Sequence, residues 1–138
     1  MKVYVDTSAL LALVHRDDAH HQAVRAATAE LAEAGAHLVT TSYVLVESGA
    51  LVQRRLGLTA FRLLGDAVAR AMDVIWVDAE LHDPAWEGVA AGSKRGPSLV
   101  DRVGLAVMQR LAIGTALAVD RHFRAAGFDT LPSLSARG

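Results

Sequence analysis

The sequence predicts an α/β fold, a three-layer α/β/α sandwich around a small central parallel sheet of four to five strands. Short β-rich apolar runs alternate with longer helical stretches, which is the pattern of βαβ units with helices on both faces of a sheet. The chain has 138 residues, the commonest size for a single domain. Neither a repeat nor a low-complexity segment nor a linker interrupts it, so we expect one domain over residues 1–138.

The first strand is expected at Lys2–Val5, a short apolar run of β-forming residues that ends at an aspartate. An apolar helical stretch follows through Val14. The segment His20–Ala34 is rich in Ala and Glu and predicts a helix that ends near Gly35. His37–Thr40 is the second strand candidate, which completes the first strand–helix–strand alternation.

The middle of the chain is expected to add two helices and a third strand. Ser42 is the expected N-cap of a helix that runs to about Arg55, and Leu58–Ala71 is a further helix. Val74–Val77 has the composition of a strand, which places Trp76 in the core.

The last part of the chain continues the alternation. Asp78 is positioned to cap the next helix, and Gly92–Pro97 is the one clear loop, marked by glycine and proline. Ser98 then opens a helix to about residue 112. Thr115–Val119 predicts a fourth strand, a short helix follows, and Phe128–Leu131 is a candidate edge strand.

Composition excludes several classes of protein. Hydrophobic residues make up 52% of the chain, which is enough to bury a core and too many for a disordered chain. No apolar stretch approaches the roughly 18–20 residues that span a bilayer. The apolar run 3–14 is interrupted by Asp6 and lacks a small-residue cleavage site, so it does not resemble a signal peptide. Without cysteine there is neither a disulfide framework nor a thiolate metal site, and we expect a cytoplasmic protein.

The net charge of −1 argues against a generally basic nucleic-acid binder. The charge is unevenly distributed, however. Residues 1–90 carry seven Lys/Arg against twelve Asp/Glu, a net −5, and residues 91–138 carry seven against three, a net +4. This asymmetry is explained either by chance on a solvated surface or by a basic rim near an acidic centre. The basic part includes Lys94, Arg95, Arg102, Arg121 and Arg124.

Two aspartates directly follow predicted strands. In open parallel sheets, ligands bind in the crevice beyond the carboxyl ends of the strands, so Asp6 and Asp120 are expected to point into it. Each also precedes a predicted helix, and Asp is a preferred N-cap. Taken alone, each aspartate is explained better as a helix cap than as a catalytic group.

Two further acidic residues lie on predicted helices. Glu47 shares a helix stripe with Tyr43 and Leu51, and a carboxylate on an apolar stripe is costly to bury unless it is paired or bound to a cation. The alternative is a Glu at the edge of the stripe that forms a salt bridge or reaches solvent. Asp101 lies in the first helical turn after Ser98, where capping and the helix dipole alone would favour an acid.

Four carboxylates from four separate elements would repel one another in one crevice unless a cation compensates them. Hard divalent cations such as Mg²⁺ or Mn²⁺ bind oxygen ligands and retained waters. Such a site activates water and stabilises charge on a phosphodiester during in-line attack, and the cation allows an acidic centre to bind an anionic substrate. Asp6, Glu47, Asp101 and Asp120 are therefore our candidate catalytic and metal-binding residues.

Four segments carry a resemblance to a known family. They are residues 3–10 (VYVDTSAL), 40–47 (TTSYVLVE), 98–101 (SLVD) and 118–123 (AVDRHF). In order, spacing and chain length they resemble the successive acidic motifs of PIN domains, and most closely those of VapC-type toxin ribonucleases of bacterial and archaeal toxin–antitoxin pairs. Each motif alone is weak, but four in register over almost the whole chain are specific.

The resemblance implies a PIN-like fold and a metal-dependent endoribonuclease, the toxin of a type II, VapBC-like pair. It implies that the four carboxylates bind Mg²⁺ or Mn²⁺, and that Thr7 or Ser8 lies beside them and orients water or a ligand. It also implies an RNA substrate and an antitoxin whose tail covers the acidic groove and inserts an Arg among the carboxylates. A homodimer through the helices between residues 42 and 71 is the last expectation.

Two positions depart from the family pattern. Val100 stands where the family often has Thr before its third acidic residue, which removes one hydroxyl near the site. Arg124 stands four residues after Asp120, where some members carry a further acidic or amide group. Both departures leave the number of bound ions, one or two, open.

Other polar residues are assigned smaller roles. The six histidines show no metal-ligand spacing, so a solvated position is expected even for His122, which follows Asp120 and would otherwise meet a phosphate. Arg102 and Arg121 each flank a predicted site acid, and each either contacts substrate phosphate or is solvated.

Two alternative functions share part of this pattern. A phosphoaspartyl phosphatase also begins with an aspartate after the first strand, but it generally needs a second Asp two residues later, where this chain has Ser8. The alternative that the sequence leaves open is a non-catalytic PIN-fold RNA-binding or protein-interaction module. An activity test separates this module from the nuclease.

Overall fold

The computed structural model describes residues 1–133, so the last five residues of the predicted domain lie outside the described part. Five parallel strands form one sheet in the order β3-β2-β1-β4-β5. Their bounds are β1 (Lys2–Val5), β2 (His37–Thr41), β3 (Met72–Ile75), β4 (Thr115–Leu117) and β5 (Asp129–Leu131). The predicted parallel sheet of four to five strands is confirmed, and β5 is the edge strand that the sequence indicated.

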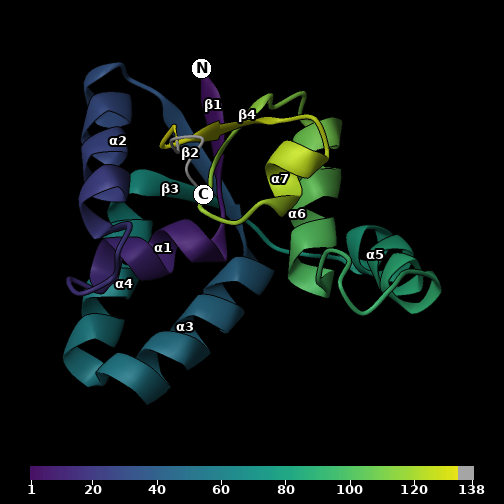
Figure 1. Cartoon of the computed structure of the whole chain (residues 1–138), viewed down its shortest axis with the longest axis horizontal. Coiled ribbons are helices and arrows are strands. Elements are labelled where there is room, and N and C mark those ends of the chain that lie inside the picture. Colours follow the sequence, from purple (N-terminus) through teal and green to yellow (C-terminus); the bar gives the residue numbers. More distant parts are fainter. Residues whose placement is uncertain (134–138) are drawn as a thin grey trace.

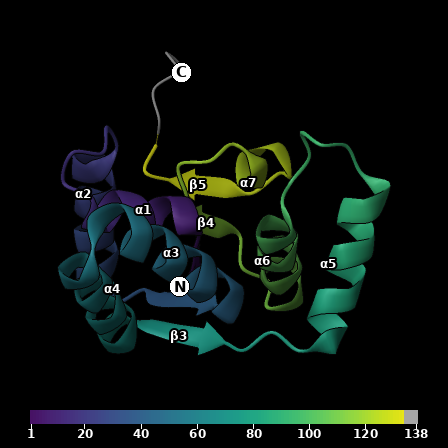
Figure 2. The same ribbon diagram turned by 90° about the horizontal axis from the view of Figure 1, so that it is seen from below.

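Helices cover both faces of this sheet, as predicted for a three-layer sandwich. Figure 1 shows α1, α2 and α4 on one side of the strands and α5, α6 and α7 on the other, with α3 below them. In Figure 2, α5 lies beyond α6, so α5 packs on a helix instead of on the sheet. The helix bounds are α1 (Thr7–Val14), α2 (His21–Glu33), α3 (Ser42–Leu56), α4 (Leu58–Ala71), α5 (Ala79–Ala91), α6 (Leu99–Arg110) and α7 (His122–Ala125).

The central strand β1 is apolar because both of its faces are covered. Val3, Tyr4 and Val5 are fully buried, and they contact a core that includes Leu10 of α1 and Phe123 of α7. A short run without polar alternation is the usual signature of such a strand. β1 therefore holds its carboxyl end, and the Asp6 that follows, at the centre of the molecule.

The predicted position of the third strand and the predicted N-cap of α3 are wrong. The third strand begins and ends two residues before the predicted Val74–Val77, and Trp76 follows it with 75% of its surface exposed. The N-cap of α3 is Thr41, whose hydroxyl accepts a hydrogen bond from the Val44 amide. The Ser42 hydroxyl instead accepts a hydrogen bond from the backbone amide of Val77.

The fourth strand is also shorter than predicted. β4 ends at Leu117, so two residues separate it from Asp120. In the described part of the chain, none of the helices combines the length and the apolar character that a membrane crossing needs.

Candidate active site

A hollow of about 390 Å³ opens at the carboxyl ends of β1 and β4 and is lined by residues of α1, α3 and α6. All four predicted acids line it, although they come from separate elements. Asp6 follows β1, Glu47 lies on α3, Asp101 lies on α6 and Asp120 follows β4. Thr7 and Ser8 of α1 also line this hollow, which we call the carboxylate hollow.

Asp6 caps α1 and faces the carboxylate hollow at the same time. Its side chain is almost fully buried, at 2% exposure, and Oδ2 accepts hydrogen bonds from the Ser8 amide (3.2 Å) and from the Ser8 hydroxyl (2.7 Å). The two roles that the sequence could not separate are therefore combined in one residue, because one carboxylate oxygen is sufficient for the cap.

Ser8 connects the two loops that carry Asp6 and Asp120. While its hydroxyl donates to Asp6, the same oxygen accepts hydrogen bonds from the backbone amides of Val119 (3.0 Å) and Asp120 (3.4 Å). The hydroxyl thus joins residues more than a hundred positions apart in the sequence. It fixes the distance between the first and the fourth carboxylate.

Asp101 is held by a capping box at the start of α6. The Ser98 hydroxyl accepts a hydrogen bond from the Asp101 amide, and Asp101 Oδ2 accepts one from the Ser98 amide, each at 3.1 Å. This reciprocal pair satisfies two amides that a helix N-terminus would otherwise leave without partners. The Asp101 side chain therefore has a fixed direction, and only 10% of it is exposed.

Burial and mutual repulsion both raise the proton affinity of the site. The pKa of Asp6 is raised to about 6: loss of hydration is the largest cause, the charges of Asp101 and Asp120 act in the same direction, and the hydrogen bonds from Ser8 oppose the change. Burial is also the largest cause that raises the pKa of Asp101, with a further rise from Asp120 and an opposing effect from Ser98. The charge of His122 opposes the rise at Asp101, and a bound cation would compensate the carboxylates further.

The donor set fits a divalent cation with oxygen ligands. Four carboxylates supply the charge, and Thr7, which also lines the carboxylate hollow, has a buried Oγ1 with no hydrogen-bond partner among the described residues. Buried hydroxyls normally have a partner, so each exception calls for an explanation. Mg²⁺ and Mn²⁺ are ions that this set of oxygens suits.

His122 is a member of the site that the sequence did not predict. The expected solvated position is not what the structure shows, since the imidazole lines the carboxylate hollow and only 21% of the side chain is exposed. Its Nε2 atom lies 3.9 Å from Asp101 Oδ2 and 3.9 Å from Asp120 Oδ1. The signal that was available is the position of His122 two residues after a site acid, at the first residue of α7.

The two predicted arginines lie differently. Arg121 is exposed beside Asp120 at the start of α7. Arg102 points to α5, because a Cβ built on Gly88 or Gly92 would lie 2.9 Å from its guanidinium nitrogens. Arg102 is not among the residues that line the carboxylate hollow.

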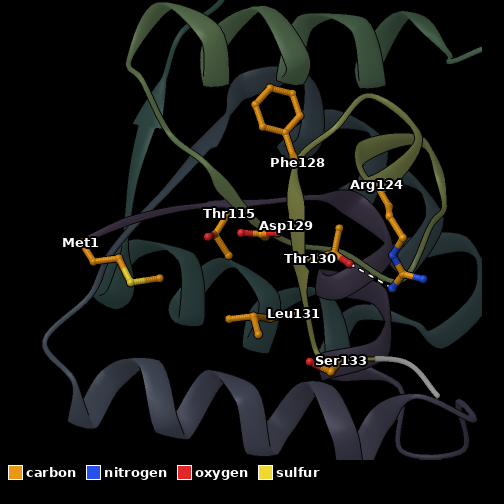
Figure 3. Close-up of a pocket in the computed structure, with 8 residues that line it drawn as sticks. All are labelled: Met1, Thr115, Arg124, Phe128, Asp129, Thr130, Leu131 and Ser133. Atoms are coloured by element: carbon orange, nitrogen blue, oxygen red, sulfur yellow. Dashed lines mark hydrogen bonds between the residues drawn. The ribbon is translucent and has the colours of Figure 1, made fainter. Parts of the chain in front are cut away.

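A larger hollow, of about 520 Å³, lies along the edge strand β5 and does not have this chemistry. Figure 3 shows Thr115, Asp129 and Thr130 facing it from the strands, and Arg124 donating a hydrogen bond to the Thr130 hydroxyl at 3.2 Å. Asp129 is the one acid among its described lining residues. Volume alone therefore does not identify the candidate site.

Comparison with known proteins places the sequence in a family. The model of the PIN domain family matches residues 3–129. The chain is 34% identical over 129 residues to the 23S rRNA-specific endonuclease VapC20 of two strains of Mycobacterium tuberculosis, and the match covers 91% of this chain and 95% of that protein.

The fold comparison agrees with the sequence comparison. The crystal structure of Mycobacterium tuberculosis VapC20, described as a Sarcin-Ricin loop cleaving toxin, superposes with a TM-score of 0.78 at 32% identity. It covers 91% of this chain and 95% of the other. A family match over most of the sequence, a close relative and the same architecture lead to one conclusion: the chain belongs to the PIN domain family.

Proposed function

We propose that this protein is a metal-dependent endoribonuclease and the toxin component of a VapBC-like toxin–antitoxin pair. One observation carries the proposal: in a PIN-domain chain, four carboxylates from four separate elements line a single hollow. The relatives named above, an rRNA endonuclease and a toxin, support the choice of substrate and biological role.

Asp6, Glu47, Asp101 and Asp120 would hold Mg²⁺ or Mn²⁺. When bound, such an ion lowers the pKa of water and offsets negative charge on a phosphodiester. The protein holds these ligands in place before the substrate binds. Ser8 fixes Asp6 relative to the Asp120 loop, and the capping box fixes Asp101, so little reorganisation is needed at the moment of reaction.

The basic part of the chain would bind the RNA backbone at the rim. Lys94 and Arg95 are exposed on the α5–α6 loop, and Gly96 of that loop lines the carboxylate hollow. Arg121 is exposed beside Asp120. Cations at these positions would contact phosphates on either side of the scissile bond. Arg102 is left out of this role because its guanidinium lies against α5.

The same proposal includes two protein partners. An antitoxin would insert an arginine among the four carboxylates, where a guanidinium pairs with carboxylates in bidentate fashion. A second copy of the chain would cover an apolar groove of about 330 Å³ between α3, α4 and β3. The groove is lined by Leu45, Gly49, Phe61, Leu64, Gly65, Val68, Ala69 and Val74.

Cleavage assays with an Asp6→Asn variant test the function. The substrates are an RNA hairpin with the sarcin–ricin sequence and unrelated structured RNAs, incubated with Mg²⁺, Mn²⁺ or EDTA. We expect metal-dependent cuts that fall at least about a hundredfold in the variant, because even an indirect partner of a metal ligand contributes 10–100-fold. Asp17→Asn, at an exposed turn, is the matched control and should cut normally.

Two outcomes would contradict the proposal. Cuts that persist in EDTA or in the Asp6→Asn protein would show that the carboxylate hollow is not the nuclease centre. Binding of RNA without any cut in either metal would favour the non-catalytic RNA-binding module.

A further inference from the structure

The imidazole of His122 lies close to two of the four carboxylates without bonding to either. Both distances from Nε2, to Asp101 Oδ2 and to Asp120 Oδ1, are 3.9 Å. Hydrogen bonds between nitrogen and oxygen are about 2.7–3.2 Å long, so the three side chains do not satisfy one another directly. The space between them is bounded by one nitrogen and two oxygens.

This spacing suits three ligands of one ion. One ligand atom from each of the three residues lies within 4.8 Å of the others. Small divalent ions bind oxygen at about 2.0–2.2 Å, so two atoms on opposite sides of such an ion are separated by roughly 4.2 Å. The 3.9 Å separations fall within that limit.

The lone pairs needed for this arrangement are available. Asp101 Oδ2 already accepts the Ser98 amide, and Asp120 Oδ1 accepts the His122 amide at 2.7 Å. A carboxylate oxygen has two lone pairs, so each retains one. The imidazole Nε2 offers its own lone pair when the ring proton is on Nδ1. The bond from the His122 amide to Asp120 also fixes the backbone of His122 relative to that carboxylate.

A second, independent feature of the same hollow points to a ligand. Thr7 also lines the carboxylate hollow, and its Oγ1 is buried and lacks a hydrogen-bond partner in the described part of the chain. A hydroxyl of this kind is satisfied by a water that an ion holds nearby.

We propose that His122 is a nitrogen ligand of the ion held by Asp101 and Asp120, and that the centre therefore binds Mn²⁺ in preference to Mg²⁺. The proposal rests on the metal-dependent function proposed above. Mg²⁺ prefers oxygen ligands and retained waters, whereas imidazole favours transition metals. The ligand set of this chain would thus contain one nitrogen in addition to the four carboxylates.

Electron spin-echo spectroscopy on the wild-type protein with Mn²⁺ tests this directly. A directly bound imidazole gives a ¹⁴N coupling to the manganese, and this coupling should disappear in His122→Asn. Calorimetric titrations should show that the substitution weakens Mn²⁺ binding about tenfold or more and Mg²⁺ binding by a smaller factor. His37→Asn is the matched control, because His37 is exposed at the start of β2, at the opposite end of the sheet.

The outcomes separate this proposal from the proposed function. Metal-dependent RNA cleavage without a ¹⁴N coupling in the wild-type protein would overturn the role of His122 and leave the nuclease intact. A coupling that persists in His122→Asn would also overturn it. Loss of cleavage in His122→Asn with unchanged Mn²⁺ affinity would place the imidazole on the RNA instead of on the ion, again against the proposal. The wild-type measurement does not depend on how well the variant folds.

Discussion

At the residue scale, Asp6 is the costliest side chain of the site. It is almost completely buried, and the carboxylates of Asp101 and Asp120 add repulsion to the loss of hydration. The two hydrogen bonds from Ser8 compensate only part of this cost, since the pKa still rises to about 6. The buried Asp6 carboxylate therefore lowers the stability of the metal-free protein.

This cost predicts how stability depends on pH. The Asp6 carboxyl ionises near pH 3.8 in the unfolded chain and near 6 in the metal-free folded protein. Between these values the folded state holds a proton that the unfolded state has released, so stability falls as the pH rises from about 4 to 6. In Asp6→Asn this loss is absent, and above pH 6 the variant should be more stable by on the order of 2–3 kcal/mol.

Urea denaturation in EDTA at pH 4.5 and pH 7.5 measures this difference. The gain of Asp6→Asn should be small at the lower pH and large at the higher one, while Asp17→Asn should show no such change. Equal stability of the wild type and Asp6→Asn at pH 7.5 would contradict the predicted cost. Added Mn²⁺ should stabilise the wild type more than Asp6→Asn, because binding to the folded state raises its stability.

The sequence predicted the acidic residues of this site better than the histidine. Asp6 and Asp120 were identified because the carboxyl ends of parallel strands meet at one edge, a rule that needs only the order of elements. Glu47 was identified because a carboxylate on an apolar stripe requires a partner. The position of His122 depends on the exact orientation of the short helix α7, and no periodic pattern determines that. Surface placement is the usual position for a lone histidine beside a loop, so the local sequence favoured the wrong interpretation.

At the element scale, the close contact between α6 and β1 brings Asp101 near Asp6. Gly104 permits this contact, because a Cβ at that position would lie 2.7–2.9 Å from the ring and hydroxyl of Tyr4. Tyr4 is fully buried, and burial raises the pKa of its phenol, so the ring remains neutral under α6. Because Tyr4 is packed in the core, its ring has little free space into which it could move to make room for a side chain at residue 104.

We therefore expect Gly104→Ala to destabilise the protein, although alanine is the better helix former. Overpacking against Tyr4 should lower the free energy of unfolding by about 1–3 kcal/mol, and cleavage should fall because α6 moves with Asp101. Gly114→Ala is the matched control, since Gly114 is exposed, has no positive φ and has nothing within 4 Å of an added Cβ. That substitution should stabilise the protein by about 0.4–1 kcal/mol, because alanine reduces the conformational freedom of the unfolded chain. Chemical denaturation measures the free energy of unfolding of both variants. An unchanged free energy of unfolding in Gly104→Ala would show that the contact between α6 and Tyr4 is looser than described.

Most elements were predictable because their signals are local. The Ala- and Glu-rich helix and the Leu58–Ala71 helix follow from composition and periodicity, and the loop after α5 follows from its Gly and Pro residues. The third strand was misplaced by two residues because Trp and Val resemble core strand residues, whereas pairing with β2 sets its true register. Trp76 lies beyond that pairing and is exposed. Local propensity does not determine which residues find a partner strand.

At the scale of the whole molecule, α3 takes part in two surfaces. Glu47 and Leu51 line the carboxylate hollow, while Leu45 and Gly49 line the apolar groove. A partner that covers the groove would therefore also hold the helix that carries Glu47. Phe61, which also lines this groove, is 42% exposed. Its ring therefore presents a large apolar surface to solvent unless a partner covers the groove.

This arrangement predicts the effect of a charge in the groove. The wild type should have twice the 14.6 kDa mass of the chain in light scattering, and Phe61→Asp should have the monomer mass, because an unpaired carboxylate is costly to bury in an interface. Val89→Asp, on the exposed face of α5, is the control and should remain dimeric. If the wild type is still a monomer at about 100 µM, the dissociation constant of any dimer lies above roughly that concentration. That result would remove the dimer from the proposed function.

The order of the strands also has a consequence for synthesis. β1 is made before both of its neighbours in the sheet, β2 and β4, and β4 is made more than a hundred residues later. A nascent chain that has not reached β4 carries Asp6 and Glu47 without Asp120, His122 or the amides that Ser8 binds. The carboxylate hollow is therefore completed only after β4 and the residues that follow it have been translated. Under the proposed function, a nascent chain without β4 is unable to cut RNA.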